Sequence, residues 1–150
     1  MATDFQPIQG ARMDDSAVDR LLEERGYGVL SMADGERAYG IPLSFGYDGD
    51  DRLYFVFVGY SEQWKKMTYA DESAVVSFLV LDVDADRGWR SAIVSGPFER
   101  ISADEWDAAR EAMADNAFRP ELLTEVDVRE NPQVWALDVE EKTGRAVGTE

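Results

Sequence analysis

Two adjacent lysines, Lys65 and Lys66, are the residues of this sequence best suited to holding a ligand. The chain has three lysines in all and places two of them side by side after an apolar stretch. In a chain with a formal net charge of -16, such a local pair of ammonium groups indicates a bound anion such as a phosphate. The hydroxyl of Ser61 and the backbone N–H groups of a short helix predicted over residues 61–69 would assist. The alternative is that both lysines lie on the surface and pair with acids such as Glu62.

A second set, Trp89, Arg90 and Ser91, combines a flat aromatic ring, a guanidinium and a hydroxyl at the start of a predicted strand. Such a set can stack on a planar ligand and hydrogen-bond to it. The alternative is a tryptophan that merely packs at the end of a barrel, and for Trp89 alone we favour this alternative.

Pro42 lies inside a strand pattern that runs from Tyr39 to Phe45. Proline has no N–H to donate to a sheet, so this position must lie at an edge or a bulge. The backbone groups freed there could face a ligand. Equally, the proline could only protect an edge of the sheet.

Several chemistries are excluded by residue types. The chain has no cysteine and no histidine, which removes disulfides, thiol nucleophiles, the usual zinc sites and imidazole-based triads. The segment Asp82-Val83-Asp84-Ala85-Asp86 imitates the start of a calcium loop, but Arg87 stands where glycine is needed and Ile93 where a bidentate glutamate is needed. We interpret this segment as a solvated acidic loop and expect no metal. No glycine-rich phosphate loop of the Walker or dinucleotide type is present.

The elements that must position these residues follow from periodicity and turn signals. A helix is predicted from one of the capping residues at 14–16 to Gly26, and a second from the capping-box sequence Ser102-Ala103-Asp104-Glu105 to about Asn116. Strands are predicted at 27–32, 39–47, 53–58, 74–81, 89–101 and 134–139, with a hairpin turn at Asp34-Gly35 and a bend at Gly96-Pro97.

These elements predict an α+β fold: a six-stranded, mostly antiparallel β-barrel, closed or partly closed, with flanking helices. Residues 1–150 are expected to form a single domain with its core at about 13–139. Residues 140–150 are interpreted as a polar tail.

Charge and composition limit the partners. The 31 acidic residues outnumber the 15 basic ones, so the chain repels nucleic acid and anionic membranes. Arginine in place of lysine together with excess acid is typical of proteins from salt-loving archaea, and we expect poor stability in dilute buffer. The first ten residues lack an apolar signal-peptide core, and the longest apolar stretch, Val75–Leu81, falls far short of the roughly 20 residues of a membrane span, which predicts a cytoplasmic location.

The order of the motifs resembles that of the pyridoxamine 5'-phosphate oxidase-like flavoproteins, especially small haloarchaeal members. The motifs are Tyr27-Gly28-Val29-Leu30-Ser31, Tyr39-x-x-Pro42-Leu43-Ser44-Phe45, Leu53-Tyr54-Phe55, Lys65-Lys66 and Trp89-Arg90-Ser91-Ala92-Ile93-Val94-x-Gly96. They span about Met13 to Ile101.

The resemblance implies a split β-barrel homodimer that binds FMN at the subunit interface. Lys65 and Lys66 would hold the phosphate. Three groups of residues would surround the ring system. Pro42, Leu43 and Ser44 would flank it, and Phe57 and Val58 would line it from their strand. Trp89, Arg90 and Ser91, from the same or the other subunit, would close the site.

The sequence also departs from the family. Val56 stands where many small relatives carry a histidine, and the C-terminal residues lack the arginine- and histidine-bearing substrate segment of the true oxidases. The resemblance therefore implies an FMN-dependent oxidoreductase of an unassigned small molecule, with no catalytic residue assigned. Two alternatives stay open: a deazaflavin-dependent reductase of the same fold, and a non-catalytic dimer that binds flavin or haem or serves as a scaffold. The absence of histidine argues against haem with its commonest axial ligand.

Overall fold

The computed structural model describes residues 10–57, 69–70, 74–116 and 133–148. Two α-helices lie in these residues, α2 (Asp15–Glu24) and α4 (Trp106–Asn116), the latter preceded by a 3-10 turn, η3 (Ala103–Glu105). The strands are β1 (Ala11–Arg12), β2 (Tyr27–Asp34), β3 (Arg37–Ser44), β4 (Gly46–Tyr47), β5 (Arg52–Phe57), β6 (Val75–Asp84), β7 (Gly88–Arg100), β8 (Gln133–Asp138) and β9 (Glu141–Val147).

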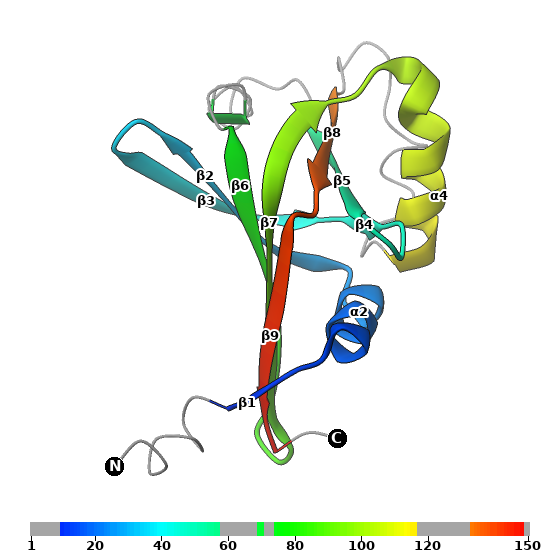
Figure 1. Cartoon of the computed structure of the whole chain (residues 1–150). Helices are drawn as coiled ribbons and strands as arrows, with labels where there is room; N and C mark the ends of the chain where they lie inside the picture. The colour runs from blue at the N-terminus through cyan, green and yellow to red at the C-terminus, as the bar shows by residue number, and fades with distance from the viewer. Residues whose placement is uncertain (1–9, 58–68, 71–73, 117–132, 149–150) are drawn as a thin grey trace.

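All these strands join one curled sheet in which every pairing is antiparallel (Figure 1). The order is β3-β2-β6-β7-β8-β5-β4, and β9 pairs with both β7 and β1. Helix α2 packs against β7 and β9, whereas α4 packs against β4 and β5. The predicted α+β class and mostly antiparallel barrel architecture are confirmed. The strand count differs in the described residues, because the strand predicted at 39–47 is divided into β3 and β4, and because β1 and β9 were not predicted.

Helix α2 forms where capping and periodicity predict it. Asp14 is the N-cap, and its carboxylate accepts a hydrogen bond of 2.8 Å from the backbone N–H of Ala17. Val18, Leu21 and Leu22 share one face of the helix and are buried in the core. The helix is therefore held by its cap at one end and by apolar burial along its length.

The hairpin of β2 and β3 turns at Gly35, which has a φ of +59°. Glycine tolerates this left-handed conformation without a side-chain clash. Pro42 lies in β3, which is the edge strand at this end of the described sheet order. The prediction that Pro42 occupies an edge is confirmed, and its missing N–H costs the sheet no hydrogen bond.

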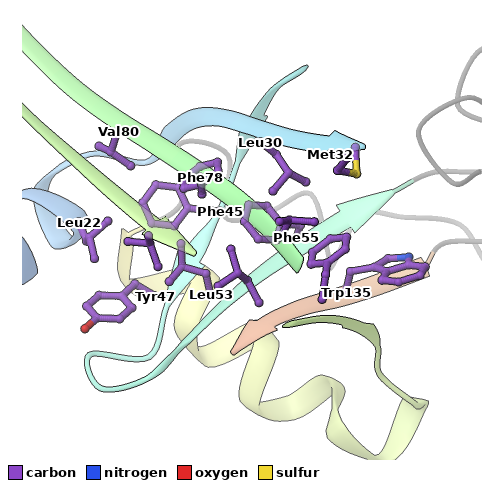
Figure 2. Close-up of a cluster of buried hydrophobic side chains, with 14 of the residues drawn as sticks. Leu22, Leu30, Met32, Phe45, Tyr47, Leu53, Phe55, Phe78, Val80 and Trp135 are labelled. Carbon is purple, nitrogen blue, oxygen red and sulfur yellow. The ribbon is translucent and has the colours of Figure 1, made fainter. Parts of the chain in front are cut away.

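The core combines aliphatic and aromatic side chains from α2 and the strands (Figure 2). The ring of Phe78 lies 4.9 Å from that of Phe45 and 5.0 Å from that of Phe55, both in edge-on contact. All three are fully buried, and each contributes about 2–3 kcal/mol by removal from water. The predicted buried strand at 53–58 is confirmed for β5; Val58 lies outside the described residues.

Strand β7 joins the two parts of the sheet and changes partner at the predicted bend. Residues Trp89–Ser95 pair with β9, whereas Phe98–Arg100 pair with β8. At Gly96 the backbone of the β8–β9 connection comes so close that an added Cβ would lie 1.7 Å from the carbonyl oxygen of Asp138. Glycine is required at this crossing because there is no room for a side chain.

Three predictions about local structure are wrong. The acidic segment 82–86 is not a loop throughout, because β6 continues to Asp84 and the turn follows it. The polar tail expected at 140–150 is instead β9 from Glu141 to Val147, which pairs with β7 along its whole length. The capping box also fails: the Ser102 hydroxyl contacts the carboxylate of Asp104, and a 3-10 turn precedes α4.

Candidate functional site

Four of the predicted ligand-binding residues lie outside the described residues: Val58, Ser61, Lys65 and Lys66. The phosphate site proposed for the two lysines therefore stays a prediction. The remaining predicted residues lie in β3, β5 and β7.

One face of the sheet formed by β3, β2, β6, β7 and β9 is directed away from the core and is called the open face below. Alternate residues of each strand lie on the open face, and residues that are paired across strands lie on the same face. Val29, for example, pairs with Pro42 and Leu79, and Leu79 pairs with Ile93. Among the described residues, five large apolar side chains are exposed, and all five lie on this face: Tyr27 (47%), Val75 (57%), Leu81 (45%), Val83 (68%) and Ile93 (48%). Such a concentration of exposed apolar surface marks an interaction site.

A groove of about 300 Å³ lies at the β7–β9 end of the open face. Trp89, Ser91 and Ile93 of β7 line it, together with Thr143 of β9. Two arginines also line the groove, Arg12 of β1 and Arg145 of β9. The groove therefore combines a flat ring, two hydroxyls and two positive charges.

The predicted set Trp89-Arg90-Ser91 is divided by the strand that carries it. Trp89 and Ser91 lie in the groove, whereas Arg90 is directed to the opposite face, because neighbouring residues of a strand alternate. There its guanidinium forms ion pairs with Asp82 at 2.6 Å and Glu24 at 3.0 Å. The hydrogen bond from Arg90 holds the pKa of Asp82 below its usual value, and the same bond raises the pKa of Arg90.

A second depression, of about 680 Å³, lies beside this ion-pair network. Its charged lining residues are Glu24, Asp82, Asp84, Arg87 and Arg90. They pair with one another: Arg90 with Glu24 and Asp82, and Arg87 with Asp84 at 3.1 Å. The charges here are largely compensated within the protein, so this depression offers little to an added ion.

The predicted residues of β3 and β5 do not reach the groove. Pro42 and Ser44 lie on the open face, but β2 and β6 separate β3 from β7. Leu43 packs against the core instead. Phe57 is 1% exposed, and its ring lies 6.3 Å from that of Trp135, so it is a core residue in this chain.

Arg12 and Arg145 were missed by the sequence analysis. Arg145 falls in the segment taken for a tail, where glycine and charged residues weaken the strand signal. Arg12 lies in a strand of two residues whose only described partner is β9, so missing β9 concealed both arginines. The alternation of Thr143, Arg145 and Val147 on one face was the available signal.

The carboxylates of the described residues do not gather as metal ligands. No group of three or more acidic residues within metal-binding reach occurs among them. Asp84, which belongs to the segment compared with a calcium loop, instead accepts hydrogen bonds from the backbone of Asp86 and from Arg87, which lower its pKa. In the same described part of the chain, no helix is long and apolar enough to cross a membrane; the cytoplasmic location stays a prediction.

Comparison with known proteins gives consistent matches. A model of the family described as pyridoxamine 5'-phosphate oxidase matches residues 14–146. An FAD-binding protein from Mesorhizobium loti is 20% identical, with a TM-score of 0.72 over 91% of this chain and 97% of that one. A search of curated proteins gives no match.

Two proteins of Mycobacterium smegmatis are also similar in structure. An FAD-binding protein is 17% identical, with a TM-score of 0.69 over 93% of this chain and 100% of that one. An FAD- and haem-binding protein is 19% identical, with a TM-score of 0.68 over 89% of this chain and 71% of that one. At these identities the likeness establishes the fold.

Proposed function

The chain belongs to the pyridoxamine 5'-phosphate oxidase family, and we propose on this basis that it binds a flavin and acts as an oxidoreductase on a small molecule. A bound flavin supplies hydride or electron transfer, which the side chains of a protein without cysteine and histidine do not provide. The residues of this chain would then bind and orient the cofactor. We take FMN as the cofactor, as the resemblance implies, although three similar structures are of FAD-binding proteins.

The observation that carries the proposal is the groove on the open face. Its volume of about 300 Å³ lies at the lower end of the range for small-molecule sites. The indole of Trp89 can stack on a planar ring, and the hydroxyls of Ser91 and Thr143 can hydrogen-bond to ring heteroatoms. The residues present therefore fit a flat, polar and anionic ligand, and a flavin phosphate is one.

We further propose that two copies of the chain share the site. Neighbouring strands lie about 4.8 Å apart, so β3 and β7, with two strands between them, are separated by about 14 Å. One copy cannot close Pro42 and Ser44 over the same ring as Trp89 and Ser91. A second copy packed on the open face can bring the β3 residues of one subunit to the β7 residues of the other, and it would cover the exposed apolar side chains.

The test is an absorption spectrum of protein purified in molar salt, followed by mass identification of the ligand released on unfolding. We expect the bands of an oxidised flavin and release of FMN. Release of FAD or a deazaflavin would correct the cofactor but keep the class, whereas a colourless protein that takes up none of the three would refute the proposal.

The phosphate assignment needs its own variant. Lys65→Ala combined with Lys66→Ala should lower the affinity for added FMN at least about tenfold, since each ammonium makes a charge-assisted contact. The matched control is Arg20→Ala with Arg37→Ala, which removes the same charge from two exposed positions in α2 and β3. Equal affinities in the two double variants would remove the lysines from the site.

A further inference from the structure

We infer that Arg12 and Arg145 form a binding site for a phosphoryl anion in the groove beside Trp89. The two residues are direct partners in the pairing of β1 with β9, and Arg145 is also the partner of Ser91 in β7. Both residues are exposed and line the same groove. The inference concerns the same groove that carries the proposed function and goes beyond it, because it assigns these two arginines to a phosphoryl group.

The charge of the groove is opposite to that of the chain. Among the described residues, its lining holds two arginines and no carboxylate, in a protein with 31 acidic and 15 basic residues. Within the described residues neither arginine has an acidic partner, whereas Arg25, Arg52 and Arg90 each pair with one or more carboxylates. Like charges directly opposite on paired strands repel each other, so an anion between them would remove an unfavourable contact.

The position of Arg145 is fixed by the backbone. One of its terminal nitrogens donates a hydrogen bond of 3.2 Å to the carbonyl oxygen of Gly10. Gly10 has a φ of +80°, and an added Cβ there would lie 2.8 Å from the carbonyl oxygen of Ala146 and 3.0 Å from the ring of Trp89. Glycine thus lets the chain pass close to β9 and hold the guanidinium, whose other N–H groups can donate to an anion.

The geometry favours phosphate over a single carboxylate. A pair of guanidinium groups offers two forks of donors, and a phosphoryl group has enough oxygens to accept from both. Trp89 in the same groove adds a surface on which a base or another flat ring can stack. The chemical class is therefore a phosphorylated compound with an aromatic ring. Its source is either the second phosphate of a dinucleotide cofactor or the phosphate of a separate substrate.

The experiment measures binding of inorganic pyrophosphate and of adenosine diphosphate to the full chain by calorimetry. Arg12→Gln and Arg145→Gln should each weaken the binding of both probes about tenfold, and Arg145→Lys should recover part of the loss. Trp89→Leu should weaken the binding of adenosine diphosphate and leave the binding of pyrophosphate unchanged. The control is Arg100→Gln, which removes an equal charge from an exposed position at the far end of β7 and should change neither affinity.

Circular dichroism tests whether the variants fold, and we expect that they do because both arginines are exposed. Binding that is unaffected in Arg12→Gln and Arg145→Gln would overturn the inference. An equal loss of binding in Arg100→Gln would also overturn it, because the loss would then be an effect of net charge.

The flavin content of the variants distinguishes the two sources of the phosphate. Loss of FAD but not FMN from the Arg145 variant indicates the dinucleotide, and unchanged flavin content with lost pyrophosphate binding indicates a separate substrate. Protein without any flavin that still binds pyrophosphate through these arginines would refute the proposed function and keep this site.

Discussion

Arg90 shows at the scale of one residue why residue type does not assign a role. It stands between Trp89 and Ser91, yet it lies on the other face of β7 and pairs with Asp82 and Glu24. Its guanidinium also shares Asp82 with Arg25, whose nearest nitrogen lies 3.6 Å from that carboxylate. Arg90 thus joins α2 to β6, and any effect of its loss on ligand binding would be indirect.

Arg90→Gln should raise the pKa of Asp82 toward its ordinary value of 3.8, because the hydrogen bond from Arg90 is the main cause of the lowering. A carboxyl whose pKa is lower in the folded state stabilises the fold above its unfolded pKa, and this contribution is lost as the pH falls through the folded pKa. The variant should therefore be less stable than the wild type by about 1 kcal/mol at pH 5–7, a difference that vanishes in stronger acid. Urea unfolding over this pH range and NMR titration of the carboxyl measure both effects.

The control for this prediction is Arg87→Gln. Arg87 pairs with Asp84 in the turn after β6 and has no part in the lowered pKa of Asp82. An Asp82 titration that moves equally in both variants would contradict the assigned cause.

At the scale of the elements, sequence reasoning succeeded where one local rule decides the structure. Pro42 had to occupy an edge or a bulge because it lacks an N–H, and it lies in the edge strand β3. Asp34-Gly35 predicted the hairpin turn, where Gly35 has a positive φ. The apolar run at 53–58 predicted β5, since a segment so rich in aromatic residues is stable only when buried.

The failures have the opposite cause: tertiary contacts overrode weak local signals. β9 contains a glycine, a lysine and an arginine, yet it forms because β7 pairs with it and because Lys142 donates a hydrogen bond of 2.7 Å to Asp19 of α2. The hydroxyl of Tyr47 donates to the same carboxylate oxygen, and burial together with this bond raises the tyrosine pKa. Because Asp19, Tyr47 and Lys142 are far apart in sequence, no periodicity could reveal that they meet.

Gly96→Ala tests the crossing of β7 between its two sets of partners. The added Cβ would lie 1.7 Å from the carbonyl oxygen of Asp138, so the β8–β9 connection must move away and lose pairing. We expect a loss of about 3 kcal/mol or more in the free energy of unfolding, measured by urea denaturation. Gly40→Ala is the matched control, because the nearest atom to its new Cβ would be 3.7 Å away, and it should be neutral or slightly stabilising. Equal effects of the two substitutions would rule out the proposed crowding at Gly96.

At the scale of the whole molecule, the open face should determine the oligomeric state. Leu81→Asp places a carboxylate among exposed apolar side chains and should convert a dimer to a monomer without unfolding it, because Leu81 is 45% exposed in one copy. Sedimentation in molar salt measures the mass. The control, Ala103→Asp, adds the same charge at the exposed start of η3 and should remain dimeric. A wild-type monomer, or a Leu81→Asp dimer, would exclude the open face as the interface.

The net charge of -16 should make the stability of the fold depend on salt. Salt weakens both the repulsion among 31 acidic groups and the attraction in ion pairs such as Arg90–Asp82, but the acids outnumber the bases by about two to one, so relief of repulsion should win. Charges interact over about 10 Å at 0.1 M salt and about 3 Å at 1 M. If screening is worth about 3 kcal/mol, the thermal midpoint should rise by roughly 10 °C between dilute buffer and molar potassium chloride.

Near pH 4.2, where the net charge approaches zero, the rise should largely disappear. A rise of the same size at both pH values would assign the effect to exclusion of salt from the protein surface instead of charge screening, since exclusion does not require a net charge.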